Sequence, residues 1–317
     1  MTFVNQQKRE ILTRFLKRHY PLPRRKELDF EINNVVTDYL AKRDTGKPFE
    51  ARGLYVTGES RTGKTKEINT AIESFNTSGT RLPDGLTARF VQCTLSGMLS
   101  WKDLGIEVLD SLGFPMAAQR NQSYIWNEVV KQARLQGVIG IHFDECQHMF
   151  TETGKITNDK VLDGFKSLCK NKHWPFVLIL SGVPALAGFV NGYDQLRELL
   201  KPVHFGLIQY PKDMAEVNNL CFAYADHGDI EFEPLAKKDF YERLAFANGH
   251  RWGLVIEMLI EALTLCKLDG QTEIDISYFE KAFARKTGIP LGFSPFSVDD
   301  YEEAFSPAEV LRLMTQG

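Results

Sequence analysis

The chain has 317 residues and a formal net charge of −3, with 43% hydrophobic and 25% charged residues. This composition supplies enough apolar material for a core and excludes a largely disordered chain, and the length favours two domains at ~150 residues each. The apolar runs are far shorter than the ~20 residues of a membrane helix, so we expect no membrane partner. The N-terminal stretch has no apolar leader, and the five scattered cysteines contain no CxxC pair. Both features favour a cytoplasmic location.

The charge is unevenly distributed along the chain. Residues 1–26 contain eight basic residues and one glutamate, whereas residues 291–317 contain five acidic residues and one arginine. Such asymmetry is typical of one end that faces a polyanion and another that binds a separate partner. The alternative is that both ends are simply solvated.

Short apolar runs alternate with helical patterns between Pro48 and Pro211. Two helices are expected before this region, at residues 4–19 and 27–43. The alternation itself predicts βαβ units and a parallel sheet that is buried on both faces. The strands are predicted at residues 53–57, 88–93, 138–143, 176–180 and 204–210, with helices at residues 64–75, 101–112, 122–135, 158–171 and 194–200.

Beyond Pro211 the strand signal fades and helical patterns continue. Helices are predicted at residues 213–226, 234–247, 251–267 and 275–287, followed by a loose tail rich in glycine and proline. The fold class is therefore α/β, a five-stranded parallel core with a small C-terminal helical lid. The predicted segments are a basic N-terminal helical segment (1–48), the α/β core (49–211), the helical lid subdomain (212–288) and an acidic tail (289–317).

The phosphate-binding pattern GxxxxGK[ST], known as Walker A, is matched by Gly58-Glu59-Ser60-Arg61-Thr62-Gly63-Lys64-Thr65. It lies between a predicted strand and a predicted helix, as the motif requires. Its glycines let the backbone curve around phosphates, and its N–H groups attract an anion. We expect Lys64 to reach the β- and γ-phosphates of ATP and Thr65 to bind Mg²⁺. The expected nucleotide-binding residues are Gly58, Glu59, Ser60, Arg61, Thr62, Gly63, Lys64, Thr65 and Lys66. Arg61 is bulky for this loop, and we expect it to point outward to a neighbouring subunit.

A hydrophobic strand that ends in two acids, the Walker B feature, follows about 80 residues later. It ends at Asp144 and Glu145. We expect Asp144 to hold Mg²⁺ through water and Glu145 to polarise the attacking water as a base. The nearby His142, Cys146 and His148 lie on differing faces, and we interpret them as packing or supporting residues rather than metal ligands.

Three further polar residues lie where ATPases of this layout carry catalytic groups. Ser181 ends the strand at 176–180 and is expected to sense the γ-phosphate, although it also fits a strand-ending turn. Arg197 precedes the last strand and is placed to reach a neighbour's ATP, where an arginine finger adds roughly 10³–10⁵ in rate. Charged neighbours make a solvated face an equal interpretation of Arg197. Arg251 opens a helix of the lid, where an arginine would contact the phosphates.

Together these motifs resemble AAA+ ATPases, and specifically the TniB/TnsC family of ATP-dependent target-selection proteins of DNA transposons. IstB and MuB are more distant relatives. The segments that carry the resemblance are Tyr20-Pro21-Leu22-Pro23, the loop GESRTGKT, the strands IGIHFDECQH and LILSGVPAL, and the tail segment GFSPF. The chain departs from the family at Arg61, at Cys146 in place of the usual alanine, and in lacking paired arginines near Arg197.

The resemblance implies an ATP-driven ring or helical homo-oligomer on double-stranded DNA. This oligomer would recruit the transposase and would be guided by a target-selection factor. Hydrolysis then disassembles the oligomer. DNA would be held in the pore by its backbone, with little sequence specificity. The implied pore contacts are Lys102, Arg120 and Ser123. Alternatively, these three are ordinary polar residues of the surface. The basic segment Arg24-Arg25-Lys26 could also bind DNA or a partner. Two other functions stay open, a replication-initiation or helicase-loading AAA+ ATPase and a nucleotide-switch signalling NTPase that does not bind DNA.

Overall fold

A computed structural model describes residues 4–95, 97–116, 119–151 and 154–316. The contacts divide the chain into two compact units. The core unit comprises Arg24–Ser60 and Lys64–Phe205, and the helical unit comprises Met1–Pro23, Arg61–Gly63 and Gly206–Gly317. Among the described residues, no helix is long and apolar enough to cross a membrane.

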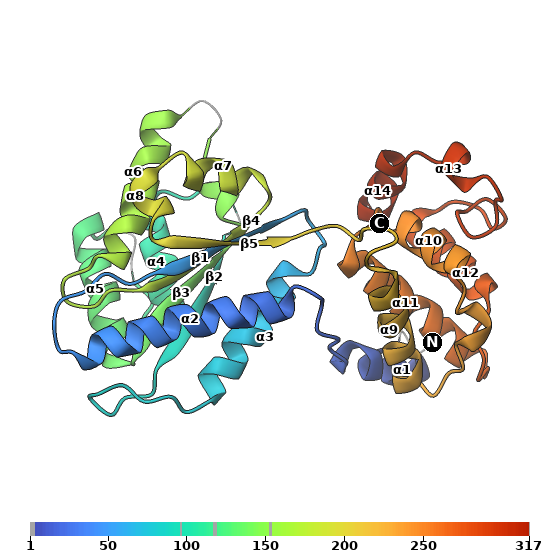
Figure 1. The fold of residues 1–317 in the computed structure, drawn as a ribbon, viewed down its shortest axis with the longest axis horizontal. Coiled ribbons are helices and arrows are strands. Elements are labelled where there is room, and N and C mark those ends of the chain that lie inside the picture. Colours follow the sequence, from blue (N-terminus) through green and yellow to red (C-terminus); the bar gives the residue numbers. More distant parts are fainter. Residues whose placement is uncertain (1–3, 96, 117–118, 152–153, 317) are drawn as a thin grey trace. The chain divides into compact units, whose positions relative to one another are not determined.

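A five-stranded sheet forms the centre of the core unit (Figure 1). All its neighbouring strands pair in parallel, in the order β2-β3-β4-β1-β5. This confirms the predicted α/β fold with a parallel five-stranded sheet. The strands are β1 (Gly53–Gly58), β2 (Arg89–Thr94), β3 (Val138–Asp144), β4 (Val177–Gly182) and β5 (Leu200–Phe205).

Burial distinguishes the inner strands from the edge strands. Every residue of β1, β3 and β4 is buried, which explains why their sequences are nearly continuous apolar runs. The edge strands β2 and β5 bury only some of their residues. Pro202 lies in β5, which pairs with β1 alone, and this fits a residue that lacks the N–H needed in a central strand.

The last strand differs from the prediction. The sequence predicts it at residues 204–210, but β5 ends at Phe205. The pairing of β5 with β1 runs from Gly53↔Leu200 to Gly58↔Phe205. β5 therefore ends opposite the last residue of β1. The apolar residue Ile208 is buried in the core of the helical unit instead.

Helices cover both faces of the sheet. Figure 1 shows α2 and α3 along one face and α6 and α7 along the other. α7 was not predicted, and the predicted helix at 194–200 is a single turn, α8. The helices of this unit are α2 (Arg25–Asp44), α3 (Lys64–Thr77), α4 (Trp101–Ser111), α5 (Gln122–Leu135), the short η1 (Cys146–Met149), α6 (Lys155–Cys169), α7 (Ala185–Asn191) and α8 (Asp194–Arg197).

The helical unit has its own apolar core, and the first helix of the chain contributes to it. α1 packs against α11, and its Phe15 is 1% exposed. The two helices of the predicted segment 1–48 therefore pack into different units, α1 here and α2 on the sheet. The helices are α1 (Gln6–Lys17), α9 (Met214–His227), η2 (Glu233–Leu235), α10 (Lys238–Ala247), α11 (Trp252–Leu268), α12 (Ile276–Thr287), α13 (Tyr301–Ala304) and α14 (Pro307–Gln316).

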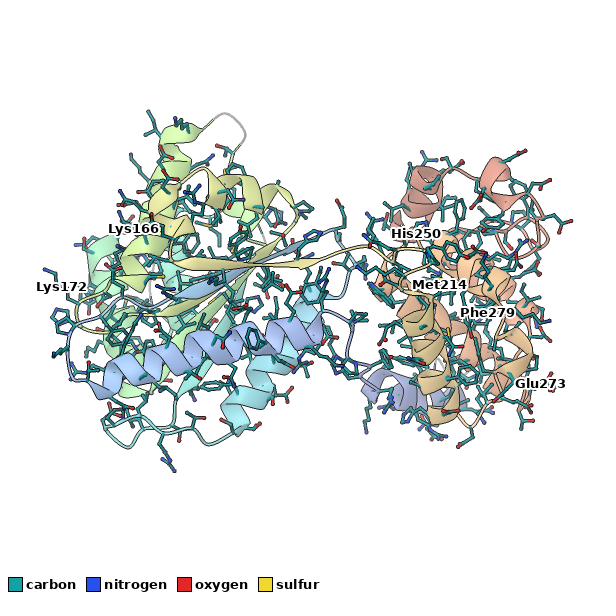
Figure 2. All side chains as sticks on the ribbon, viewed as in Figure 1. Lys166, Lys172, Met214, His250, Glu273 and Phe279 are labelled. Atoms are coloured by element: carbon teal, nitrogen blue, oxygen red, sulfur yellow. The ribbon has the colours of Figure 1, made fainter. Side chains whose placement is uncertain are left out.

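The C-terminal segment is folded rather than loose, which corrects the expectation from its glycines and prolines. Its Phe296 ring contacts those of Phe240 and Phe279, with centroids 6.3 and 5.7 Å away. Phe279, labelled in Figure 2, is fully buried in this aromatic cluster. Arg243 also donates hydrogen bonds to the carbonyls of Pro295 (2.9 Å) and Val298 (2.6 Å). Buried aromatic rings therefore anchor a segment whose acidic residues are exposed.

Candidate nucleotide site

The GxxxxGKT segment forms a tight loop between β1 and α3. β1 ends at Gly58 and α3 begins at Lys64, as the motif predicts. Gly63 has φ 92°, a value that a side chain rarely allows, so the second glycine of the motif is required by the backbone. Arg61 has φ 65° and is exposed.

The amine of Lys64 is held inside the curve of this loop. Its side chain is buried, and Nζ donates to the carbonyls of Gly58 (2.8 Å) and Glu59 (2.9 Å). A positive charge thus lies where the loop turns, next to the N-terminus of a 14-residue helix. Cation and helix terminus together favour an anion such as a phosphate group.

The two predicted magnesium ligands meet at the carboxyl end of the sheet. The Thr65 hydroxyl donates to Oδ2 of Asp144 at 2.8 Å, although the two lie on α3 and on the end of β3. A hydroxyl and a carboxylate are oxygen ligands of the kind that Mg²⁺ prefers beside phosphates. The donor set therefore fits a magnesium-nucleotide site.

Glu145 follows Asp144 directly and lies outside regular structure. Its φ of 58° turns the chain sharply after β3, an arrangement that costs a non-glycine residue on the order of 1–3 kcal/mol. The side-chain amide of Gln147 donates to Oε2 of Glu145. Gln147 in turn accepts a hydrogen bond from the N–H of Val183, in the turn after β4, at 3.2 Å. The sequence prediction missed Gln147, which connects the expected base to the neighbouring strand end.

Ser181 lies next to Asp144 and is fully buried. Its hydroxyl is 2.5 Å from Oδ1 of Asp144 and 2.8 Å from Nε2 of His142. Burial lowers the pKa of His142 to about 4, so its ring is neutral near pH 7. The expected sensor is therefore hydrogen-bonded to these two side chains, and the Phe143 carbonyl is a further, more distant acceptor at 3.5 Å.

A buried ion pair supports the first turn of α3. Arg25 at the start of α2 contacts Glu67 at 3.2 Å, and their side chains are 12% and 2% exposed. Arg25 also contacts Asp29 at 2.6 Å, and Arg24 contacts Glu27 at 2.8 Å. Both arginines are thus engaged within the core unit, which weakens their prediction as DNA contacts.

The two expected catalytic arginines lie on different units. Arg197 ends α8 in the core unit, where its half-exposed side chain pairs with Asp194 at 2.9 Å. Arg251 caps α11 in the helical unit, is 9% exposed and donates to the carbonyl of Gly249 at 3.3 Å. Their roles toward a nucleotide stay predictions.

The three expected DNA contacts lie at the starts of α4 and α5, between β2 and β3 as predicted. Lys102 is in the first turn of α4, and Ser123 is in the first turn of α5. Arg120 is exposed, and its guanidinium lies 5.1 Å from the centre of the Tyr124 ring. The two helices are joined by stacked Trp101 and Trp126 rings at 4.7 Å.

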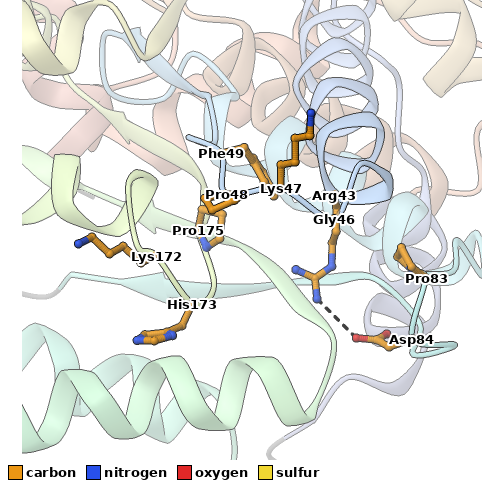
Figure 3. Close-up of a pocket in the computed structure, with 10 residues that line it drawn as sticks. All are labelled: Arg43, Gly46, Lys47, Pro48, Phe49, Pro83, Asp84, Lys172, His173 and Pro175. Atoms are coloured by element: carbon orange, nitrogen blue, oxygen red, sulfur yellow. Dashed lines mark hydrogen bonds and ion pairs between the residues drawn. The ribbon is translucent and has the colours of Figure 1, made fainter.

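A cavity of about 350 Å³ lies at the opposite edge of the sheet (Figure 3). It is formed by segments that precede β1, β2 and β4, whereas the phosphate-binding loop follows β1. Arg43 lies over the buried Trp174 ring at 3.9 Å and contacts Asp84 at 3.5 Å. The cavity is therefore separate from the nucleotide site, and its exposed Lys47 and Lys172 provide control positions.

Comparisons with known proteins agree with this geometry. Residues 47–189 match the family described as AAA domain. The fold is similar to Cdc6p from Pyrobaculum aerophilum, with a TM-score of 0.59, 16% identity and coverage of 85% of this chain and 69% of that chain. It is also similar to the ORC2 protein of Aeropyrum pernix (TM-score 0.60, 12% identity, coverage 86% and 70%). A third similar structure is the ORC1 protein of Aeropyrum pernix in complex with DNA (TM-score 0.59, 12% identity, coverage 88% of this chain and 72% of that chain). A sequence comparison with curated proteins gave no significant match.

The core unit thus has the α/β fold of AAA+ P-loop proteins. Residues 47–189 match the AAA-domain family, and a helical C-terminal region follows. The comparisons give no evidence for the TniB/TnsC branch, which stays a prediction from the sequence motifs.

Proposed function

We propose that the protein is a magnesium-dependent ATPase whose nucleotide state controls its assembly on double-stranded DNA. The observation that carries the ATPase part is the contact between Thr65 and Asp144 beside the buried Lys64 amine. This contact brings the loop, the Thr65 hydroxyl and the Asp144 carboxylate together at one edge of the sheet, next to Glu145, which supports a site for magnesium and phosphates.

Each residue of this edge has a separable role in hydrolysis. The loop N–H groups and Lys64 bind the β- and γ-phosphates and disperse their charge. Thr65 and Asp144 would hold Mg²⁺, which would supply positive charge beside the phosphoryl oxygens. Glu145 accepts a proton from the attacking water, and Gln147 orients its carboxylate. Arg197 would reach the ATP of a neighbouring subunit in an oligomer. Arg251 would contact the phosphates.

A binding assay tests the nucleotide site. Lys64→Ala should lose ATP binding and ATP-dependent DNA binding together, because it removes the cation inside the loop. Lys47→Ala, an exposed lysine at the opposite edge of the sheet, is the matched control and should bind ATP normally. ATP-dependent DNA binding retained by Lys64→Ala would contradict the assignment.

The DNA part is supported by charge and by the similar structures. One similar structure is an ORC1 protein in complex with DNA, and another is "Drosophila ORC bound to DNA". In this chain, the partly buried Lys102 and the exposed Arg120 lie at the starts of α4 and α5. α1 and its C-cap residue add four basic side chains with no ion pair among the described residues, namely the partly buried Lys8 and the exposed Arg9, Lys17 and Arg18. Basic side chains are suited to phosphate contacts, which supply affinity without sequence specificity.

The salt dependence of DNA affinity distinguishes side chains that contact phosphates from charged side chains that face only solvent. Each lost phosphate contact should reduce the slope of log affinity against log salt by about 0.9. The first pair of variants is Lys102→Gln and Arg120→Gln, and the second pair is Lys8→Gln and Arg9→Gln. The slope of each variant is compared with that of the wild type, and Lys172→Gln is the control. An unchanged slope in both pairs would exclude these surfaces. No ATP-dependent DNA binding by the wild type would favour the signalling switch.

Two processes on DNA are candidates. The loop, strand and tail motifs support a transposition regulator that recruits a transposase and answers to a target-selection factor. The likeness to Cdc6p and ORC proteins favours the second candidate, a replication initiator or helicase loader. ATP-dependent capture of a transposase by the DNA-bound protein supports the first, and capture of a replicative helicase supports the second.

A further inference from the structure

Three polar side chains form a buried hydrogen-bond chain behind the proposed magnesium ligands. Nε2 of His142 is 2.8 Å from the Ser181 hydroxyl, which is 2.5 Å from Oδ1 of Asp144. Oδ2, the other oxygen of Asp144, accepts from Thr65. His142, Asp144 and Ser181 are at most 3% exposed. The chain therefore ends on the carboxylate that faces the nucleotide site.

Proton positions in this chain follow from the acceptor at its end. An ionised Asp144 has no proton to give, so the short contact requires the Ser181 hydroxyl to donate to it. Ser181 has one hydrogen, and its oxygen must then accept from His142. His142 therefore carries its proton on Nε2. Its other nitrogen, Nδ1, is buried and has no hydrogen-bond partner among the described residues.

The sheet holds the three groups in register. β3 and β4 pair in parallel with His142↔Ile179 and Phe143↔Leu180, which continues to Asp144 beside Ser181. Every residue of both strands is buried. The imidazole thus lies where an aliphatic side chain would also fit. Its unpaired, buried Nδ1 costs about 1–3 kcal/mol, a cost that an aliphatic side chain would not have. Within the described part of the chain, the hydrogen bond to Ser181 offsets part of this cost.

We propose that His142 is a positioning residue for the magnesium site, acting through Ser181 on Asp144. The donated hydrogen bond fixes the Ser181 hydroxyl so that it points at Oδ1. Together with the Glu145 N–H, which donates to the same oxygen at 3.0 Å, this hydroxyl fixes the rotation of the Asp144 carboxylate and keeps Oδ2 toward Thr65. Ser181 then serves as the link in this chain, and its role differs from that of a free γ-phosphate sensor. The inference rests on the proposed magnesium-nucleotide site.

The test measures nucleotide affinity with Mg²⁺ and with EDTA, using a fluorescent ATP analogue and the full-length protein. His142→Leu and Ser181→Ala should each lower affinity about 10-fold in Mg²⁺, the usual size for a lost partner of a metal ligand. Both should stay within about twofold of the wild type in EDTA. His142→Gln keeps a donor near the position of Nε2 and should restore most of the magnesium effect.

A control variant separates positioning from general damage to β3. Trp174 donates from Nε1 to the carbonyl of Val138, at the other end of the same strand, at 2.6 Å. Trp174→Phe should lower the melting temperature without changing the ratio of the two affinities. A His142→Leu variant that loses affinity equally in Mg²⁺ and EDTA, or keeps both, would overturn the proposal.

A direct measurement covers the case in which His142→Leu does not fold. ¹⁵N NMR of imidazole-labelled wild-type protein should show His142 with its proton on Nε2 and an unprotonated Nδ1. A proton on Nδ1 would overturn the proposed chain. If the wild type itself binds nucleotide equally in Mg²⁺ and EDTA, the proposed function fails, which is a different result from either outcome above.

Discussion

The Thr65 hydroxyl lies 2.8 Å from Oδ2 of Asp144, although 79 positions separate the two residues in the chain. One belongs to the helix after the phosphate-binding loop and the other to the end of β3. Parallel strands β1 and β3 each end at this edge, with β4 between them. Two sequence motifs that were recognised separately therefore form a single site.

Glu145→Gln should bind ATP normally and lose roughly 10²–10⁴-fold in turnover, the usual contribution of a general base. The amide keeps the size of the side chain and the hydrogen-bonding reach of Gln147 but accepts no proton from water. Phosphate release and ATP binding are measured on the same preparation. Turnover at the wild-type rate would show that Glu145 is not the base.

Gln147→Leu should lower kcat roughly 10-fold with little change in KM, because one hydrogen bond to a charged group contributes about 1.5 kcal/mol. The lost amide no longer ties Glu145 to the turn after β4. His148→Ala, one residue further and exposed, is the control. Equal losses in the two variants would indicate a general disturbance of the η1 turn.

Arg25→Met should destabilise the protein by about 3–5 kcal/mol, since it leaves the buried Glu67 carboxylate without its charge partner. Arg25→Met combined with Glu67→Leu should recover much of this loss, because the buried carboxylate is removed together with the arginine. Urea unfolding followed by circular dichroism gives the free-energy differences. Arg24→Met breaks only the exposed pair with Glu27 and should change stability by about 1 kcal/mol or less. A double variant as unstable as Arg25→Met would contradict this account.

The acidic C-terminal segment requires charge variants rather than a deletion. Removing residues 291–317 would also remove the buried Phe296, Phe305, Val310 and Met314 and expose the core of the helical unit. Neutralising Asp299, Asp300, Glu302 and Glu303, which are exposed, should preserve ATPase activity and abolish transposase capture. Neutralising the exposed Glu231 and Glu273 in the same unit is the control. Normal capture by the first variant would exclude the acidic segment as the docking site.

The core of the fold was predictable where burial is complete. β1, β3 and β4 are buried along their whole length, so their apolar runs identified them and placed Gly58 and Asp144 at strand ends. β5 was misplaced because an edge strand alternates and Pro202 weakens its pattern. The C-terminal segment was misread because its anchors, such as Phe296, are single aromatic residues separated by acids and turns.

The site was predictable in its motifs and less so in its connections. The chemistry of Lys64, Thr65, Asp144 and Glu145 follows from residue type and spacing. The link from His142 through Ser181 depends on β3 and β4 being neighbours in a particular register. No local pattern carries that register, because it is set by the pairing of strands that are separated by α6.

The most direct test of the central claim measures duplex DNA binding by the Glu145→Gln protein in three states: with ATP and Mg²⁺, with ADP and Mg²⁺, and without nucleotide. Fluorescence anisotropy of a labelled duplex gives the affinity, and electron microscopy of the same mixtures shows any rings or filaments. We predict tight, salt-sensitive binding and ordered oligomers with ATP only. Equal DNA binding in all three states, or none with ATP, would contradict the proposal that the nucleotide state controls assembly on DNA.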